Sequence, residues 1–312
     1  MKKVLFIDSV HPLVEKELAK KGFQVEHDYS SSKEEIAKIL NQYEGLIIRS
    51  RFKIDQEFLS HPHQLNFIGR YGAGLENIDT AFAEQQKITC IRVPEGNADA
   101  VGEQAIGMLL MLFNNLKRAD QEIRNGIWKR EENRGYELSG KTVGIIGAGH
   151  MGSRMIRKLQ GFDCQILVYD KYKRMDEVGF VQVELNEIFK RADIVSIHTP
   201  LTEETDNWMN ENFWNQFYKP IYFINTARGP IVNTKSLIDA IDQGKISGAC
   251  LDVLEYEKTS FENLFENKEL PEAFQRLIAS EKVILSPHIA GWSFESYVKL
   301  GTTMVDKILA LY

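Results

Sequence analysis

Three side chains in the second half of the chain, Arg228, Glu257 and His288, could together act on a small carboxylic acid. A guanidinium binds a carboxylate as a planar fork, and its charge stabilises a carbonyl oxygen on which negative charge grows. An imidazole moves a proton near neutral pH, and a carboxylate beside it favours its protonated form. Each residue alone has an ordinary structural explanation, as a surface ion pair, a solvated acid or a loop histidine. Their combination predicts a hydride-transfer site only if the chain also supplies a cofactor.

A glycine-rich turn at residues 147–152, with the sequence GAGHMG, precedes all three side chains. It follows an apolar segment that reads as a strand and opens a helical segment, which is the context of a dinucleotide-binding turn. In such a turn Gly147 allows the tight bend, Gly149 lets the backbone approach the pyrophosphate, and Gly152 permits close packing of helix on strand. The amides of His150 and Met151 would face the phosphates at the helix N-terminus. A purely structural turn is the alternative.

Asp170 ends the next predicted strand, about 20 residues after the glycine turn, where a carboxylate accepts hydrogen bonds from the adenosine ribose. A carboxylate there also repels the 2′-phosphate of NADP, so the sequence predicts NAD as the cofactor. The basic run at residues 171–174 could bind that phosphate instead, although a solvated loop is the simpler interpretation.

Short apolar segments alternate with amphipathic helical segments along the chain, which is typical of parallel sheets. Strands are predicted at residues 3–8, 23–26, 45–49, 66–70, 88–91, 142–146, 165–169, 194–197, 221–225, 248–253 and 283–285. The pattern predicts an α/β chain with two doubly wound parallel-sheet domains. A flavodoxin-like substrate domain would comprise residues 1–97 and 286–312, and a Rossmann dinucleotide-binding domain residues 98–285.

Composition excludes several classes of protein. A chain of 312 residues with 43% hydrophobic content can bury the cores of about two domains. Its longest apolar run, residues 105–113, is too short to span a membrane, and Asp8 interrupts the first apolar stretch too early for a secretory signal. We therefore expect a cytoplasmic protein without membrane contact. The net charge of −6 argues against a nucleic-acid surface.

No metal site is predicted. Cys90, Cys164 and Cys250 are an odd number without C-x-x-C spacing, so neither a disulfide framework nor a zinc site is indicated. The pair His61 and His63 is better explained as a surface feature than as metal ligands.

Six ordered blocks resemble the D-isomer-specific 2-hydroxy acid dehydrogenases over essentially the whole chain. These blocks are residues 69–79, 144–152, 198–202, 225–229, 251–257 and 286–291. The resemblance implies that Arg228 binds the substrate's carboxylate and carbonyl, that His288 is the acid and base, and that Glu257 pairs with His288.

The resemblance implies further contacts. Thr199, Thr226 and Asp252 would contact the cofactor, with Asp252 near the nicotinamide carboxamide, and the backbone around Ala73 and Gly74 would receive the substrate carboxylate.

The chain departs from the family pattern at a few positions. Lys258 follows Glu257 where a proline is common, which leaves the conformation of that loop open. Glu76 stands where aspartate is often found, and Gln104 where histidine is frequent. We expect neither of these two changes to affect the proposed chemistry.

The substrate is predicted from weaker features. Residues 49–51 and 94–97 look like their counterparts in 3-phosphoglycerate dehydrogenases, and Arg49 and Arg51 could bind a distal phosphate. This favours a phosphorylated hydroxy acid, with glyoxylate, hydroxypyruvate or another 2-hydroxy acid as alternatives. The alternative is that only one of the two arginines enters a common site.

Two further expectations concern association. Relatives with this architecture include NAD(H)-sensing transcriptional corepressors, but the complete set of Arg228, Glu257 and His288 favours an enzyme. A helix predicted from residue 98 to about 128 carries an apolar run, Ile106, Leu109, Leu110 and Phe113, that predicts a homodimer, with a place in an ordinary domain core as the alternative.

Overall fold

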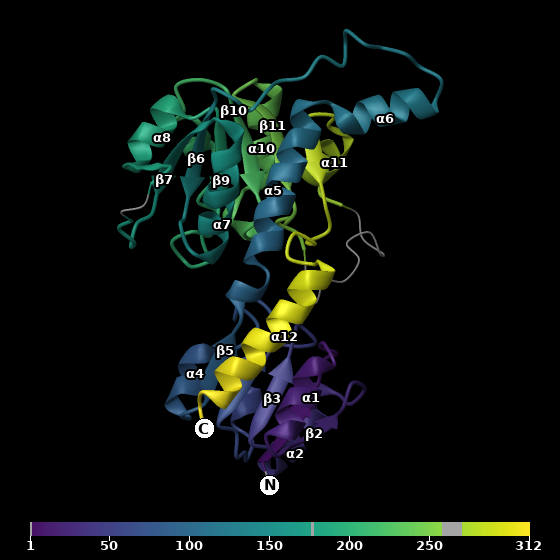
Figure 1. Ribbon diagram of the computed structural model, residues 1–312, viewed down its shortest axis with the longest axis vertical. Helices are drawn as coiled ribbons and strands as arrows, with labels where there is room; N and C mark the ends of the chain where they lie inside the picture. Colours follow the sequence, from purple (N-terminus) through teal and green to yellow (C-terminus); the bar gives the residue numbers. More distant parts are fainter. Residues whose placement is uncertain (1, 176–177, 258–269) are drawn as a thin grey trace. The chain divides into compact units, whose positions relative to one another are not determined.

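The computed structural model describes residues 2–175, 178–257 and 270–312, which form two compact units (Figure 1). The described part of the N-terminal unit comprises residues 2–98 and Trp292–Tyr312, and that of the second unit comprises Asp99–Glu257 and residues 270–291.

The N-terminal unit is built on a five-stranded parallel sheet of order β2-β1-β3-β4-β5. Its strands are β1 (Lys2–Phe6), β2 (Phe23–His27), β3 (Gly45–Ile48), β4 (Phe67–Arg70) and β5 (Thr89–Arg92). Its helices are α1 (Leu13–Lys20), α2 (Lys33–Ile39), α3 (Gln56–Leu59), α4 (Thr80–Gln85) and α12 (Phe294–Leu309), with short 3-10 turns at Leu40–Gln42 and Pro94–Gly96. Helix α12 comes from the end of the chain and packs beside α1 and β5, as Figure 1 shows. Its apolar face, which includes Leu300 and Met304, joins the core over Ile47 and Phe67.

The second unit is built on a seven-stranded parallel sheet of order β12-β11-β10-β9-β6-β7-β8. Its strands are β6 (Thr142–Ile146), β7 (Gln165–Tyr169), β8 (Val181–Gln182), β9 (Ile194–Ile197), β10 (Ile221–Asn225), β11 (Ile246–Leu251) and β12 (Val283–Leu285). Its helices are α5 (Ala98–Phe113), α6 (Leu116–Arg124), α7 (His150–Leu159), α8 (Leu185–Arg191), α9 (Glu211–Trp214), α10 (Thr234–Asp242) and α11 (Glu272–Ala279), with 3-10 turns at Gln160–Phe162 and Gly229–Ile231. The strand order reverses between β6 and β9, as in a Rossmann sheet. The predicted fold class, two doubly wound parallel-sheet domains, is confirmed.

The long helix predicted from residue 98 to about 128 is wrong in its extent. Helix α5 ends at Phe113, and Asn115 adopts a left-handed backbone with φ of 52° before α6 begins. Asparagine tolerates this conformation better than most residues, so the chain can turn there. Helix α6 then ends at Arg124, short of Trp128.

The apolar run on α5 belongs to the core of its own unit. Ile106, Leu109 and Phe113 are 7%, 0% and 1% exposed and pack with residues of the central strands, while Leu110 is partly buried against the same cluster. This run therefore does not offer the subunit interface that the sequence suggested. Within the described residues, no helix is both long and apolar enough to cross a membrane.

Candidate active site

The glycine turn joins β6 to α7, and its shape requires glycine at two positions. Gly147 has a φ of +92°, and a Cβ atom there would lie 2.9 Å from the carbonyl carbon and oxygen of His198. A Cβ atom at Gly152 would lie 2.0 Å from the oxygen of Gly147. Gly149 is different, because nothing lies within 4 Å of its Cβ position. The turn is therefore closely packed at Gly147 and Gly152, whereas the space in front of Gly149 is open.

This open side coincides with the first turn of α7, where Gly149 is the N-cap and His150 is exposed. The first backbone N–H groups of a helix have no partner within the helix, and together with the helix dipole they bind phosphate. Gly149, His150 and Met151, which the sequence predicts to face a pyrophosphate, thus lie at the N-terminus of α7.

Asp170 follows β7 and is fixed by backbone donors. Its Oδ2 accepts from the amide of Ala148 at 2.7 Å, and its Oδ1 accepts from the amides of Tyr172 and Lys173, both at 2.9 Å. Burial opposes the charged form of this carboxyl, but the three amides outweigh it and hold its pKa below the ordinary value. A stable negative charge therefore stands beside the glycine turn.

The basic run after Asp170 is partly neutralised by its own surroundings. The ammonium of Lys171 forms an ion pair with Glu204, and the hydroxyl of Tyr172 lies 3.2 Å from the same carboxylate. The structure thus favours the solvated-loop interpretation for Lys171 over phosphate binding.

Thr199 and Thr226 follow β9 and β10 at the same edge of the sheet. The Oγ1 atom of each is buried and has no hydrogen-bond partner among the described residues. A buried hydroxyl without a partner costs about 1–3 kcal/mol, so natural sites supply one from the protein, from water or from a ligand. These orphaned hydroxyls, the open Gly149 and the charged Asp170 fit a dinucleotide.

His288 and Glu257 form a direct pair. Nδ1 of His288 lies 3.0 Å from Oε1 of Glu257, and the two side chains are only 26% and 18% exposed. His288 has a left-handed backbone with φ of 55°, which is unfavourable for a residue with a Cβ atom and persists only where surrounding contacts impose it. The sequence did not predict the conformation of the loop after Glu257, where Lys258 replaces a common proline, and this loop lies outside the described residues.

Asp252 supplies those contacts. Its carboxylate, in a residue that is 1% exposed, accepts from the amides of Ile289 and Ala290, both at 2.9 Å, and its carbonyl accepts from the amide of His288 at 2.7 Å. The hydroxyl of Ser286 also donates to the carboxylate, at 2.6 Å. The role that the structure gives Asp252 is to hold the histidine loop, whereas the resemblance implied a cofactor contact.

Gln104 donates from Nε2 to Oδ1 of Asp252 at 3.2 Å and to Oγ of Ser286 at 3.1 Å. Gln104, which stands where histidine is frequent in the family, thus contacts a residue that holds the histidine loop; the expectation that this change does not affect the proposed chemistry stays a prediction. Sequence reasoning also missed Ser286, for which a polar side chain directly after β12 was the available signal.

Arg228 lies in a loop after β10 that is folded by Asn225. The side chain of Asn225 accepts from the amide of Ala227 at 2.9 Å and donates to the oxygen of Arg228 at 3.0 Å. A Cβ atom at Gly229 would lie 2.0 Å from the oxygen of Leu254, so only glycine lets this loop approach the one that carries Glu257. Arg228, Glu257 and His288 thus follow three neighbouring strands, β10, β11 and β12, at one edge of one sheet.

The N-terminal unit holds the other predicted contacts, Arg49, Arg51, Ala73 and Gly74, after β3 and β4. The guanidinium of Arg51 donates to the backbone oxygens of Ile7 at 3.2 Å, of Asp28 at 2.6 Å, and of Ser31. These three bonds give Arg51 a structural task in its own unit.

Arg49 is arranged differently, because its guanidinium lies over the indole of Trp292, 4.5 Å from the ring centre. Arg70, on the neighbouring strand, was overlooked within a matching block. It pairs in register with Ile48, and its guanidinium fills the space in front of Gly72, where a Cβ atom would be 1.6 Å from Nη1.

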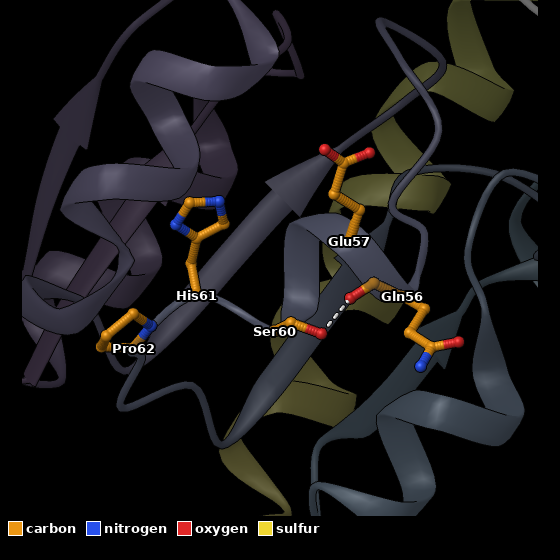
Figure 2. A pocket seen from close by; sticks show the side chains of 5 residues that line it. All are labelled: Gln56, Glu57, Ser60, His61 and Pro62. Carbon is orange, nitrogen blue, oxygen red and sulfur yellow. Dashed lines mark hydrogen bonds between the residues drawn. The ribbon is translucent and has the colours of Figure 1, made fainter.

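A surface hollow of 590 Å³ lies beside α3 in the N-terminal unit, lined by Gln56, Glu57, Ser60, His61 and Pro62 (Figure 2). No predicted site residue lines it. Among the described residues no group of histidine, cysteine and acidic side chains is arranged to hold a metal ion.

Comparison with known proteins adds three findings. Residues 106–290 match the family model described as D-isomer specific 2-hydroxyacid dehydrogenase, NAD binding domain. The chain is 30% identical over 295 residues to D-3-phosphoglycerate dehydrogenase of Archaeoglobus fulgidus, covering 94% of this chain and 54% of that protein, so it spans about half the length of that relative. It is also 30% identical over 276 residues to hydroxypyruvate reductase of Thermotoga maritima, covering 88% of this chain and 87% of the relative.

Among solved structures, D-lactate dehydrogenase from Aquifex aeolicus, complexed with NAD and lactic acid, superposes with a TM-score of 0.84 at 27% identity. The match covers 99% of this chain and 95% of that one.

Proposed function

The chain belongs to the D-isomer-specific 2-hydroxyacid dehydrogenase family, and from this premise we propose that it is an NAD-dependent oxidoreductase of a D-2-hydroxy acid and its 2-oxo partner. The observation that carries the proposal is the pair of His288 and Glu257, 3.0 Å apart. This pair lies at the same sheet edge as the glycine turn and Arg228. A structural histidine needs neither an acid on Nδ1 nor a left-handed backbone.

The bound nicotinamide would accept or donate the hydride at the substrate carbon. His288 takes the hydroxyl proton as the alcohol is oxidised and returns it to the oxygen as the oxo acid is reduced. Because Glu257 holds Nδ1, proton transfer to the substrate falls to Nε2. The carboxylate of Glu257 stabilises the imidazolium and fixes the orientation of the ring.

Arg228 binds the substrate carboxylate and stabilises charge on the reacting oxygen, since its fork offers two parallel donors. The backbone amides around Ala73 and Gly74 are proposed to receive the same carboxylate. Thr199 and Thr226 would hold the cofactor through hydroxyls that lack partners among the described residues. Asp170 would accept from the ribose hydroxyls and exclude a 2′-phosphate.

For the substrate, we propose a phosphorylated hydroxy acid, 3-phosphoglycerate. Two arginines support this proposal, because both lie at the carboxyl ends of neighbouring strands and a guanidinium binds phosphate. Arg49 directly follows β3, and Arg70 is the last residue of β4, which pairs with β3. Arg51 is withdrawn from the proposal because three backbone oxygens engage its guanidinium. Hydroxypyruvate or glyoxylate is the alternative, and the name of one relative, hydroxypyruvate reductase, is in keeping with the first of these.

A substrate panel tests both levels of the proposal. NADH oxidation is measured with phosphohydroxypyruvate, hydroxypyruvate, glyoxylate and pyruvate, and NAD reduction with the corresponding hydroxy acids, in the D form where the acid is chiral. We expect kcat/KM to be at least tenfold higher for the phosphorylated pair, and Arg49→Gln to abolish most of that preference. A higher kcat/KM for hydroxypyruvate would refute the phosphorylated substrate. No turnover with any acid, while NADH still binds, would favour an NAD(H)-sensing protein instead.

We also propose a homodimer, but through α6 and the segment after it. Here apolar side chains are exposed, with Ile123 at 54%, Ile127 at 41% and Trp128 at 83%. Helix α6 stands beyond the sheet of its own unit (Figure 1). Clustered exposed apolar groups mark association surfaces, and two-fold symmetry is the commonest arrangement of oligomers.

Light scattering should give twice the chain mass of 35.8 kDa. Ile123→Asp combined with Trp128→Asp should give a monomer, and a monomeric unmodified protein at micromolar concentration would refute the dimer.

A further inference from the structure

A closed network of three side chains lies behind the histidine loop. Gln104 comes from α5, Asp252 follows β11 and Ser286 follows β12. Each contacts the other two, with Gln104 Nε2 to Asp252 Oδ1 at 3.2 Å, Gln104 Nε2 to Ser286 Oγ at 3.1 Å, and Ser286 Oγ to Asp252 Oδ1 at 2.6 Å. We propose that Gln104 is a positioning residue for His288. This role rests on the proposed function of His288 as acid and base.

The chemistry of the three groups fixes the direction of every bond. A carboxylate only accepts, so the hydroxyl proton of Ser286 points to Asp252 and a lone pair of its oxygen is left for Gln104. The amide of Gln104 then uses both N–H bonds, one toward each partner. A flipped amide would turn its oxygen toward the carboxylate of Asp252, which is repulsive. The network therefore has one favoured arrangement.

The network determines the conformation of the loop through Asp252. The same carboxylate accepts from the amides of Ile289 and Ala290, and the backbone of Asp252 accepts from the amide of His288. The loop from Ser286 to Ala290 is thus bound on both sides of a residue whose left-handed backbone is unfavourable by itself. Gln104 is the one member of the network that belongs to neither loop, so it holds Asp252 and Ser286 in place from α5.

The first test follows the loop without substrate or turnover. Gln104→Met keeps side-chain length and helix propensity but removes both donors. Hydrogen–deuterium exchange of the peptide spanning residues 286–291 should become about tenfold faster, because Asp252 and Ser286 lose an anchor. The matched control is Gln85→Met on α4, which is exposed and lies in the other unit. It should leave this exchange unchanged.

The second test follows catalysis in the 312-residue protein. Gln104→Met should lower kcat about tenfold with the Kd for NADH within twofold of normal, whereas Gln104→His, which keeps an N–H donor, should recover kcat to within threefold. Unchanged exchange at residues 286–291, or a normal kcat in Gln104→Met, would overturn the positioning role. The two claims can fail separately. If the unmodified protein turns over no acid, the proposed function is refuted; if exchange is still faster in Gln104→Met, the anchoring of the loop by Gln104 is supported.

Discussion

Acid should destabilise the second unit through His198, the residue that follows β9 beneath the glycine turn. Nε2 of its ring lies 3.0 Å from the hydroxyl oxygen of Ser196 and 3.2 Å from the sulfur of Met155. Although part of the residue is accessible, Nδ1 is buried and has no hydrogen-bond partner among the described residues. Burial lowers the pKa of His198 from 6.5 to about 4.

The size of the effect follows from this shift. Between these two pKa values the unfolded chain binds a proton that the folded protein does not, so stability decreases as the pH falls. Above pH 6.5 the contribution of His198 to stability is fully present, and it is lost progressively as the pH falls toward 4. At pH 5 the loss amounts to about 2 kcal/mol, since each pKa unit corresponds to about 1.4 kcal/mol.

Urea unfolding at pH 7.5 and at pH 5.0 measures this loss. The unmodified protein should lose about 2 kcal/mol more stability between the two pH values than His198→Gln, because all other titrating groups are shared and cancel. The transition of the second unit is recognised because NADH, which binds the folded state, shifts it to higher urea. His61→Gln in the N-terminal unit serves as the control and should behave like the unmodified protein. An equal loss in the unmodified protein and in His198→Gln would refute the reasoning.

The remaining predictions concern the proposed site. His288→Ala should lower kcat by about 10²–10⁴-fold with the Kd for NADH little changed, and near-normal turnover would contradict its role. Glu257→Gln should lower the reductive kcat about tenfold, because a neutral amide does not stabilise the imidazolium; an unchanged kcat would argue against the pair. Arg228→Lys should raise KM and lower kcat together in steady-state kinetics, since an ammonium lacks the planar fork. Asp170→Ala should narrow the ratio of NADPH to NADH dissociation constants in fluorescence titrations, and equal affinities in the unmodified protein would remove Asp170 as the selectivity determinant.

The sequence could predict the features that depend on local patterns. Each buried strand is a short apolar segment, and the glycine turn is specified by contiguous residues, so the fold class and the place of Gly147 follow without a structure. The helix break at Asn115 could not be predicted in this way, because a single asparagine continues a helix or ends it at little difference in free energy. The predicted subunit interface on α5 was wrong for another reason. The sequence of an apolar helix face is the same whether a sheet or a second subunit covers that face.

Gln104 shows the limit for the candidate site. Its partner Asp252 lies 148 residues away along the chain. The sequence gives no indication that this neutral helix residue contacts Asp252, because the contact depends on the packing of α5 against β11 and β12. For the two arginines, nothing in the sequence indicated that backbone oxygens would engage the guanidinium of Arg51.

One structural device recurs at the loops that carry the site. Asp8, Asp170 and Asp252 each follow a buried strand, β1, β7 and β11, and each accepts amide protons from the loop after the neighbouring strand. Asp8 accepts from three successive amides ending at Arg51, Asp170 from Ala148, and Asp252 from the loop of His288. Because hydrogen bonds to a charged acceptor are stronger than those to a neutral one, each acid fixes its neighbouring loop more firmly than an amide could. An acid within two residues after a buried parallel strand is therefore a sequence feature that predicts which neighbouring loop it binds, and in this chain those loops carry Arg49, the glycine turn and His288.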